Sequence, residues 1–228
     1  MADKSEVERE RELLMTATTT IYLTRHGQTE WNVQHRMQGH MDSALTALGL
    51  QQAEWLNRGM RDTNLNVVYT SPSPRALRTA EIILGERSIP LETADEFKEI
   101  CMGVWEGCDS AVLEKEYIEQ YRYFWEDPDQ FAVEGSETFM EVRSRALEKL
   151  EEILVKHEGE SVLIVTHTVV IKLLMGYFEG RDMTKLWDLP YIHPTCLSRI
   201  DFKDGKPEIM LHGDISHYDE MNSAGMES

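Results

Sequence analysis

The sequence predicts an α/β fold, a three-layer α/β/α sandwich built around a mostly parallel sheet. Three short apolar runs rich in β-branched residues support this prediction, at 18–24, 66–70 and 161–166. Each run is followed by a polar turn and then by a helical pattern. Strands that are apolar on both faces are typical of parallel sheets covered by helices. The alternation of strands and helices therefore indicates a single α/β unit without internal repeats.

The helical segments begin at recognisable start signals. Thr46 is a suitable N-cap for a helix that reaches about residue 61, because apolar side chains recur there at helical spacing. Pro74 lies in the first turn of the next helix. Residues 137–157 form a long amphipathic pattern that ends at Gly159, as expected for a helix closed by glycine.

The last third of the chain predicts one more helix and a hairpin. Residues 168–178 form a helical pattern directly after the third strand, and 196–213 form two short strands with Asp204-Gly205 in the turn. The segment 107–135 differs from the rest because it is helical, acidic and aromatic. We expect this segment to be a small cap inserted into the main domain.

Composition limits the domain organisation and the partners. With 228 residues and 41% of them hydrophobic, the chain can bury one substantial core, which we assign to a single domain from 18 to 228. Residues 1–17 are charged and lack the apolar centre of a secretory signal, so we expect an exposed extension there. The formal charge of −18 argues against nucleic acid or an anionic membrane surface as partner.

Two further observations concern the compartment. No apolar run approaches the roughly 18 residues of a membrane-spanning helix. Cys101, Cys108 and Cys196 have no CxxC spacing and indicate reduced thiols, and therefore a cytoplasmic protein without a zinc site. The sequence carries no signal for an oligomeric state.

Candidate catalytic side chains follow the predicted strands. In open α/β sheets, ligands bind beyond the carboxyl ends of the strands, so residues that follow different strands can meet at one edge. Another candidate lies in an irregular stretch between two glycines. The candidates are Arg25, His26, Arg75, Arg78, His167 and, between the glycines, Glu99.

This combination of side chains suits a phosphoryl group. A phosphate monoester carries about −1.5 to −2 charge near neutral pH, and an arginine fork binds its oxygens bidentately. The chain has no Walker loop, so the nucleophile must come from elsewhere. A neutral imidazole could attack phosphorus, because flanking arginines would lower its pKa. A buried Glu99 could protonate the leaving alkoxide, an effect typically worth about 10²–10⁴-fold.

Six ordered segments resemble the histidine phosphatase superfamily, also called the phosphoglycerate-mutase-like family. Their order and spacing match the family from residue 18 to about 217, and they most resemble its short, broad-specificity PhoE-like phosphatases. The segments are RHGQTEWN at 25–32, MQGHMDSALTALG at 37–49, YTSPSPRALRTAE at 69–81, EICMGVWEG at 99–107, GSETFMEVRSR at 135–145 and VLIVTHTVVIKLL at 162–174.

The resemblance implies a role for each matching residue, and it implies neither a cofactor nor a metal. His26 matches the histidine that becomes phosphorylated, and Arg25 and Arg75 match the arginines that hold the phosphate. His167 matches the second histidine of the pocket. Glu99 matches the general acid that later activates water.

Other positions match the substrate site of the family. Thr168 replaces a glycine that is common after the second histidine. We expect this position to act in the substrate site through its backbone N–H, which threonine keeps. Arg78 has no counterpart in the pocket and is expected to be a surface or packing residue. The remaining matches to the substrate site are Thr29, Asn32, Gln38 and Gly39.

Several activities share such a site. In the cap, acidic side chains outnumber Lys115 and Arg122, and aromatic residues fill much of the rest. This pattern favours hydrolysis of a small phosphorylated substrate with an apolar or bulky leaving group.

The main alternative is a 2,3-bisphosphoglycerate-dependent phosphoglycerate mutase. A non-catalytic module that binds phosphorylated ligands is another alternative, although it would not need Glu99. A metal-dependent phosphatase could use Asp214 and His217, and a chelator would distinguish it.

Overall fold

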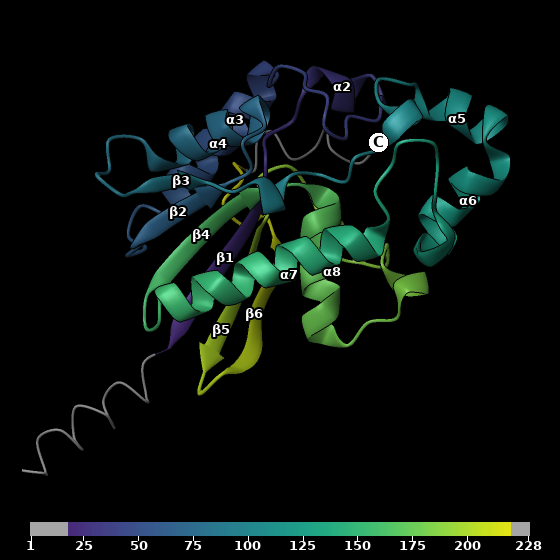
Figure 1. Cartoon of the computed structure of the whole chain (residues 1–228). Helices are drawn as coiled ribbons and strands as arrows, with labels where there is room; N and C mark the ends of the chain where they lie inside the picture. Colours follow the sequence, from purple (N-terminus) through teal and green to yellow (C-terminus); the bar gives the residue numbers. More distant parts are fainter. Residues whose placement is uncertain (1–17, 220–228) are drawn as a thin grey trace, which may run out of the picture.

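A six-stranded sheet forms the centre of the computed structural model, which describes residues 18–219 (Figure 1). The strand order is β3-β2-β4-β1-β5-β6. The first four strands in this order pair in parallel, and β5 pairs antiparallel with β1 and β6. The sheet is therefore mostly parallel, as predicted. The strands are β1 (Thr19–Arg25), β2 (Val67–Thr70), β3 (Leu91–Thr93), β4 (Ser161–Thr166), β5 (Leu197–Lys203) and β6 (Lys206–Asp214).

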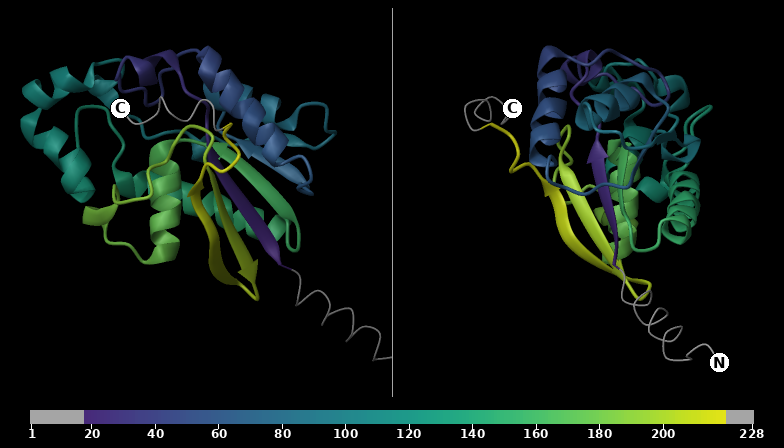
Figure 2. Two further views of the ribbon diagram at one scale, coloured as in Figure 1. Left: turned by 180° about the vertical axis from the view of Figure 1, so that it is seen from behind. Right: turned by 90° about the vertical axis from the view of Figure 1, so that its left-hand side faces the viewer.

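Helices cover both faces of the sheet and complete the predicted sandwich. Helices α3 and α4 lie on one face, and α7 and α8 lie on the other (Figures 1 and 2). The helices are α2 (Glu30–Val33), α3 (Ala47–Gly59), α4 (Pro74–Leu84), α5 (Ser110–Glu116), α6 (Ile118–Glu126), α7 (Phe139–Lys156) and α8 (Thr168–Glu179). Short 3₁₀ turns are η1 (Asp95–Phe97), η2 (Gly103–Trp105), η3 (Pro128–Gln130) and η4 (Met183–Lys185). None of the helices described between residues 18 and 219 is long and apolar enough to cross a membrane.

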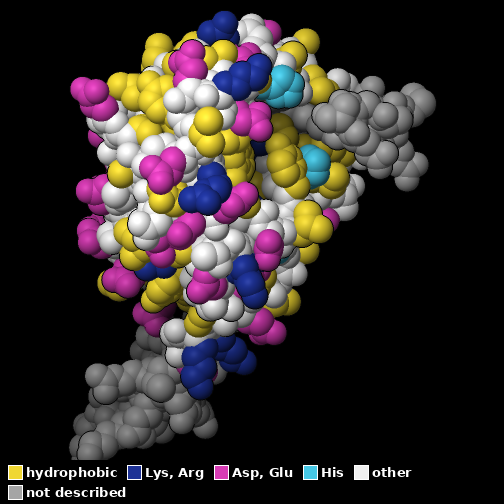
Figure 3. Space-filling view, turned by 90° about the vertical axis from the view of Figure 1, so that its right-hand side faces the viewer, with side chains coloured by type: hydrophobic (Ala, Val, Ile, Leu, Met, Phe, Trp, Pro, Cys, Tyr) yellow, Lys and Arg dark blue, Asp and Glu magenta, His cyan; other side chains and the backbone are white. Residues whose placement is uncertain are grey.

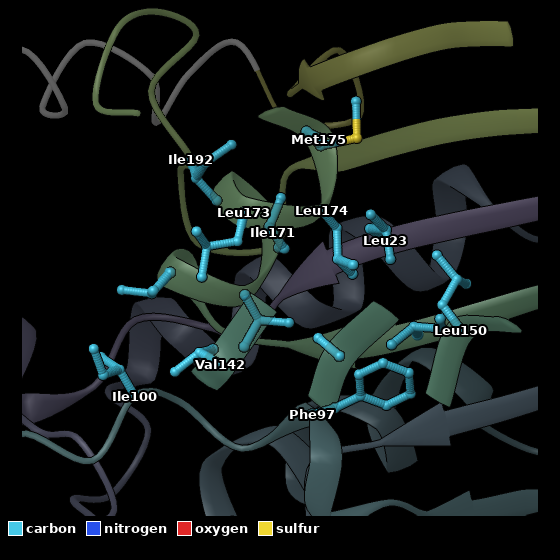
Figure 4. Packing of buried hydrophobic residues seen from close by; sticks show 14 of the residues in the cluster. Leu23, Phe97, Ile100, Val142, Leu150, Ile171, Leu173, Leu174, Met175 and Ile192 are labelled. Carbon is cyan, nitrogen blue, oxygen red and sulfur yellow. The ribbon is translucent and has the colours of Figure 1, made fainter. Parts of the chain in front are cut away.

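Strand β4 shows why both layers form. Its alternate side chains point to opposite faces, so Leu163 and Val165 pack with α3 and α4. Val162 and Ile164 join the larger cluster under α7 and α8. Figure 4 shows other members of this cluster, among them Val142 of α7 and Leu174 of α8. A strand that is buried on both faces must be apolar throughout, which is the pattern that predicted it.

The helix starts also follow the sequence signals. The side chain of Thr46 accepts a hydrogen bond from Gly49 N at 2.9 Å. Thr138 and Glu141 form a capping box at the start of α7. Pro74 occupies the first helical position of α4.

The segment 107–135 folds into α5, α6 and η3, which confirms the predicted helical and aromatic cap. This cap projects at one side of the molecule, beyond the ends of α7 and α8 (Figures 1 and 2). The buried Trp105 lies at its base and contacts four cap aromatic rings at centroid distances of 5.1–6.2 Å. The predicted N-terminal extension, 1–17, lies outside the described residues.

Candidate active site

Strand register brings the candidate residues to one edge of the sheet. Arg25 is the register partner of Thr166, so the residues that follow β1 and β4 leave the sheet side by side. The backbone N–H of His26 donates to the Thr166 carbonyl at 3.0 Å. Ser71 N, after β2, donates to the Val165 carbonyl at 3.0 Å. The polar ends of three strands thus converge, as the sequence predicted.

The imidazole of His26 is held in one tautomer. Its Nδ1 lies 2.7 Å from the Gly27 carbonyl oxygen, which can only accept, so Nδ1 carries the proton. Nε2 therefore keeps its lone pair, and Arg75 Nε donates to it at 3.3 Å. Burial lowers the pKa of His26 well below its usual value, and the charges of Arg75 and Arg25 lower it further. The ring is a neutral base whose Nε2 lone pair accepts the long hydrogen bond from Arg75.

The guanidinium of Arg75 is buried, and all five of its N–H groups are engaged. Asp42 is its charged partner, with Nη1 and Oδ1 2.9 Å apart. The five acceptors are His26 Nε2 at 3.3 Å, the Met41 carbonyl at 2.8 Å, Asp42 Oδ1 at 2.9 Å, the Gly39 carbonyl at 2.8 Å and His167 Nδ1 at 3.3 Å. The two longest contacts are those to the histidines, so these are the contacts that an incoming anion can replace most readily.

His167 is the second imidazole of the site. It is fully buried, and its ring centroid lies 5.1 Å from that of His26. Because Arg75 donates to Nδ1, Nε2 carries the proton and donates to Ser71 Oγ at 2.8 Å. Burial lowers the pKa of His167 well below its usual value, with Arg75 as the next cause. Both histidines of the site are therefore neutral.

Arg25 offers the site an unused donor. Its Nη1 donates to the Ile192 carbonyl at 2.9 Å. Its Nε is buried and has no hydrogen-bond partner among the described residues. A buried guanidinium N–H without an acceptor is costly unless a ligand supplies one, so this atom is suited to an anion.

Glu99 also lines the cavity and is buried. Its Oε1 accepts from Ile100 N at 3.0 Å, and Oε2 accepts from Val169 N at 3.4 Å. Burial raises the pKa of Glu99 above its ordinary value, although these backbone bonds and the arginines oppose the shift. A carboxyl group of raised pKa beside a phosphate site can serve as a proton donor.

The polypeptide that carries Glu99 is fixed by Arg145 of α7. The Arg145 guanidinium donates to the carbonyls of Glu96, Lys98 and Glu99 at 2.6, 2.8 and 3.1 Å. It also pairs with Glu137, whose Oε2 accepts from Cys101 N at 2.8 Å. The loop is therefore held on both sides of Glu99.

The predicted substrate residues divide into two groups. Asn32, Gln38, Gly39 and Thr168 line the cavity, whereas Thr29 is fully buried behind it. Thr29 Oγ1 caps α2 by accepting from Asn32 N at 3.2 Å, and it also accepts from Gln38 Nε2 at 2.7 Å. Thr29 thus supports the wall rather than forming its surface.

Two glycines meet steric demands at this site. Gly39 has φ +54°, and a Cβ there would lie 2.2 Å from Glu106 Oε1. Gly27 follows strand β1 but has no left-handed φ, so the chain does not need glycine there for a turn. A Cβ on Gly27 would instead lie 2.4 Å from the Gly49 carbonyl oxygen. Close packing against α3, and not turn geometry, requires glycine after His26.

The cavity has a volume of about 430 Å³ and an aromatic wall. At its polar end lie Arg25, His26, Arg75 and Glu99. Lys172 of α8 and Arg36 also line it. Figure 3 views the molecule from the side of the cap and shows hydrophobic side chains around a hollow on this face. The aromatic residues that line the cavity are Trp31, Phe124, Trp125, Trp187 and Tyr191.

Other candidates lie outside the cavity. Arg78 forms an exposed ion pair with Glu81 at 3.0 Å, as expected for a surface residue. The nearby His193 is also outside the cavity lining, although Tyr191 and Ile192 belong to it. Asp214 accepts hydrogen bonds from Ser216, and residues 18–219 contain no group of three or more His, Cys, Asp or Glu placed to hold a metal ion. The cysteines are unpaired.

Sequence reasoning missed four residues of the site. Asp42 and Arg145 lie within the segments that carry the family resemblance, but nothing local marks them as partners of Arg75 and Glu99. Lys172 lies in a helical pattern that reads as core. Arg36 precedes the second segment by one residue. Of these four residues, only Lys172 had a signal in the sequence that could have marked it as functional, because it is a cation inside an otherwise apolar helix.

Comparisons with known proteins identify the family and the fold. The family model described as "Histidine phosphatase superfamily (branch 1)" matches residues 21–215. "Uncharacterized phosphatase PhoE" of Bacillus subtilis is 33% identical over 199 residues, which cover 87% of this chain and 96% of the relative. "Probable phosphoglycerate mutase GpmB" of Salmonella choleraesuis is 29% identical and covers 87% of this chain and 94% of the relative.

A solved structure shares the fold. "Bacillus stearothermophilus YhfR" superposes with a TM-score of 0.85 at 43% identity, over 87% of this chain and 98% of the other. The family match spans most of the chain, and the similar proteins include a phosphatase of nearly the same length. This chain is therefore an enzyme that belongs to branch 1 of the histidine phosphatase superfamily and resembles its PhoE-like phosphatases.

Proposed function

We propose that the protein is a broad-specificity phosphomonoester hydrolase that works through a phosphohistidine on Nε2 of His26. The observation that carries this proposal is the fixed tautomer of His26. The Gly27 carbonyl holds the proton on Nδ1, and Nε2 is left as a neutral nucleophile beside Arg75. A nucleophile whose pKa is lowered by burial and by two arginines stays unprotonated at acidic as well as neutral pH.

In the first step, the Nε2 lone pair attacks phosphorus and the P–O bond of the ester breaks. The electron pair leaves with the ester oxygen, which takes the proton of Glu99. In the second step, water attacks the phosphohistidine and gives its proton to the Glu99 carboxylate. The N–P bond breaks, inorganic phosphate leaves, and both side chains return to their starting states.

The phosphoryl oxygens have donors on several sides. The unpartnered Nε of Arg25 and the Nε and Nη2 of Arg75 are charged donors. Thr168 begins α8, so its backbone N–H and the helix dipole favour an anion there. A bound dianion would also raise the pKa of His167, and a protonated Nδ1 could then donate to a phosphoryl oxygen. Because the transition state of phosphoryl transfer is loose, such electrostatic stabilisation supplies most of the catalysis.

The wall of the cavity suggests the kind of leaving group. Trp125 and Trp187 lie on it with ring centroids 4.7 Å apart, and Tyr191 lines it from the 188–195 loop. Flat apolar walls stabilise flat apolar groups by burial and ring contacts. We therefore expect small phosphorylated substrates with an apolar or bulky alcohol. Unpaired cysteines support the cytoplasm as the compartment.

The substitution His26→Ala tests the mechanism. We expect it to lower kcat by at least about 10³-fold, because the nucleophile is lost. Rapid quenching into alkali, followed by mass spectrometry, should detect a phosphoryl group on the parent enzyme and none on the variant. His193→Ala is the matched control, because His193 lies outside the cavity lining. Undiminished hydrolysis by His26→Ala would rule out the phosphohistidine.

A phosphoglycerate mutase is the second candidate, since a relative carries that name. The parent enzyme should be given 3-phosphoglycerate together with catalytic 2,3-bisphosphoglycerate. Hydrolysis predicts free phosphate as the main product. Fast isomerisation with little free phosphate would instead establish the mutase.

A further inference from the structure

Lys172 is a buried cation in the cavity for which the proposed mechanism has no use. It is 4% exposed, yet it lines the cavity together with the aromatic wall. Its Nζ donates to the Asp188 carbonyl at 2.5 Å and to the Pro190 carbonyl at 2.9 Å. An ammonium has three N–H donors, so these neutral carbonyls leave one donor for another acceptor.

The charge balance of the cavity favours an anion as that acceptor. Among the described residues that line it, Arg25, Arg36, Arg75 and Lys172 are cationic, and Glu99 is the one carboxyl group. Glu99 must be protonated to act as an acid, and the phosphoryl group occupies the two arginines at the polar end. Arg36 is exposed, so Lys172 is the buried charge that remains without an anionic partner.

Lys172 stays charged in spite of its burial. Desolvation lowers its pKa to about 8, Arg181 acts in the same direction, and Glu179 and Asp188 oppose it. At neutral pH the ammonium therefore predominates. An ammonium held only by carbonyl dipoles in a desolvated site gains strongly from a carboxylate.

Helix α8 brings both Lys172 and Thr168, at the phosphate site, to the cavity. Lys172 follows Thr168 by four residues, so both lie on one face of the helix, with Cβ atoms about 5–6 Å apart. Both residues line the cavity, and the Lys172 Nζ lies at the Asp188 and Pro190 carbonyls, beside the loop that carries Tyr191 of the aromatic wall. An anion bound by Lys172 would therefore share the cavity with the phosphoryl group.

We propose that Lys172 binds a carboxylate on the leaving alcohol, and that the enzyme prefers phosphate esters of flat alcohols with a carboxylate at the far end. The aromatic wall would cover the flat body of such an alcohol, and the third N–H of the ammonium would donate to its carboxylate. This inference rests on the proposed phosphomonoester hydrolysis, because it concerns the alcohol released there.

Two substrates of equal shape test the proposal, 4-carboxyphenyl phosphate and 4-carbamoylphenyl phosphate. We expect the parent enzyme to favour the carboxylate by at least about tenfold in kcat/KM, mainly through KM, because one charge-assisted hydrogen bond is gained. Lys172→Met should bring this ratio to about one, and Lys172→Arg should keep part of it. Lys115→Met, which removes an exposed lysine of the cap, should leave the ratio unchanged.

The ratio of kcat/KM between the two esters distinguishes binding of the carboxylate by Lys172 from a purely structural role of Lys172 in the 188–190 loop. If Lys172 only stabilises residues 188–190 through its hydrogen bonds, Lys172→Met will lower kcat/KM for both substrates by the same factor. The proposal is then wrong. Equal hydrolysis of both esters by the parent would also overturn it, even if the methionine variant does not fold. Failure of the proposed mechanism looks different: neither ester is hydrolysed, or the preference is present without any phosphoryl group on His26.

Discussion

At the scale of single residues, two arginines of α4 show how position decides role. Arg75 is buried with five acceptors, whereas Arg78, three residues later, is exposed and pairs with Glu81. We expect Arg75→Ala to lower kcat/KM by about 10²–10³-fold, because a preorganised charged donor is lost. Arg78→Ala should change it by less than about twofold, since exposed ion pairs contribute little. Steady-state kinetics on one aryl phosphate would check both, and similar losses would contradict the assignment.

Glu99 gives the reaction a pH dependence whose sign follows from burial. Its raised pKa keeps the carboxyl protonated at a pH where an exposed glutamate is ionised. The acid form is needed in the first step, so kcat/KM should fall as the pH rises through this pKa. The neutral state of His26 persists to lower pH, because its pKa is depressed. The pH profile should therefore favour mildly acidic conditions.

The substitution Glu99→Gln should remove this alkaline limb from the pH profile. With an alkyl phosphate we expect a loss of about 10²–10⁴-fold, because the alkoxide leaves without a proton. With 4-nitrophenyl phosphate the loss should be much smaller, since nitrophenolate needs no proton. Glu114→Gln, an exposed residue of the cap, is the control. Equal losses with both substrates would show that Glu99 does not act as the acid.

The residues that sequence reasoning found are those that a strand end or a family motif marks. Arg25 ends a strand, and His26 and His167 follow strands directly, so topology alone predicts that they meet. Asp42 lies 33 residues from Arg75, and Arg145 lies 46 residues from Glu99. Such partners are chosen by tertiary packing, and no local pattern encodes them.

At the scale of elements, α7 reaches into the site through Arg145. We expect Arg145→Lys to lower kcat more than it raises KM, because a lysine cannot hold Glu137 and three backbone carbonyls together. The alkaline limb of the pH profile should shift as well, since Glu99 would lose its fixed surroundings. Arg143→Lys, on the same helix, is the matched control. A change in KM alone would argue against this role for Arg145.

The elements themselves were predicted where their signals are long or chemically marked. The central strands β1, β2 and β4 are buried on both faces, and their apolar runs show it. Strand β3 was missed because Leu91–Thr93 is a three-residue edge strand in which Leu91 is half-buried and the other two side chains are exposed. Helix α2 was missed because it has one turn, held by the capping box between Thr29 and Asn32. Strand β3 and helix α2 depend on contacts with neighbouring elements more than on the pattern of their own residues.

At the scale of the whole molecule, buried and half-buried histidines make stability depend on pH. Burial lowers the pKa values of His26, His167, His193, His212 and His217. In the unfolded chain these rings bind protons below about pH 6.5, whereas in the folded chain they bind them only at lower pH. The unfolded state therefore gains protons first, and stability falls as the pH drops below about 6.5.

Urea unfolding at pH 7.5 and pH 5.5 would measure this effect. Each neutral histidine can contribute up to about 1.4 kcal/mol per pH unit to the fall in the free energy of unfolding. We expect a lower unfolding midpoint at pH 5.5, and a smaller difference between the two pH values in the variant His26→Gln. An unchanged midpoint in the parent would mean that the buried rings are protonated in the folded protein.

The contact between Gly27 and Gly49 sets a boundary for redesign of this enzyme. The turn after His26 and the first turn of α3 touch through backbone atoms, so even a methyl group at either position would push the nucleophile away from phosphorus. Mutant libraries at Gly27 and Gly49 should yield almost no active variants. The aromatic wall has no such restriction, so new substrate ranges should be sought there, with the phosphate-holding end left as it is.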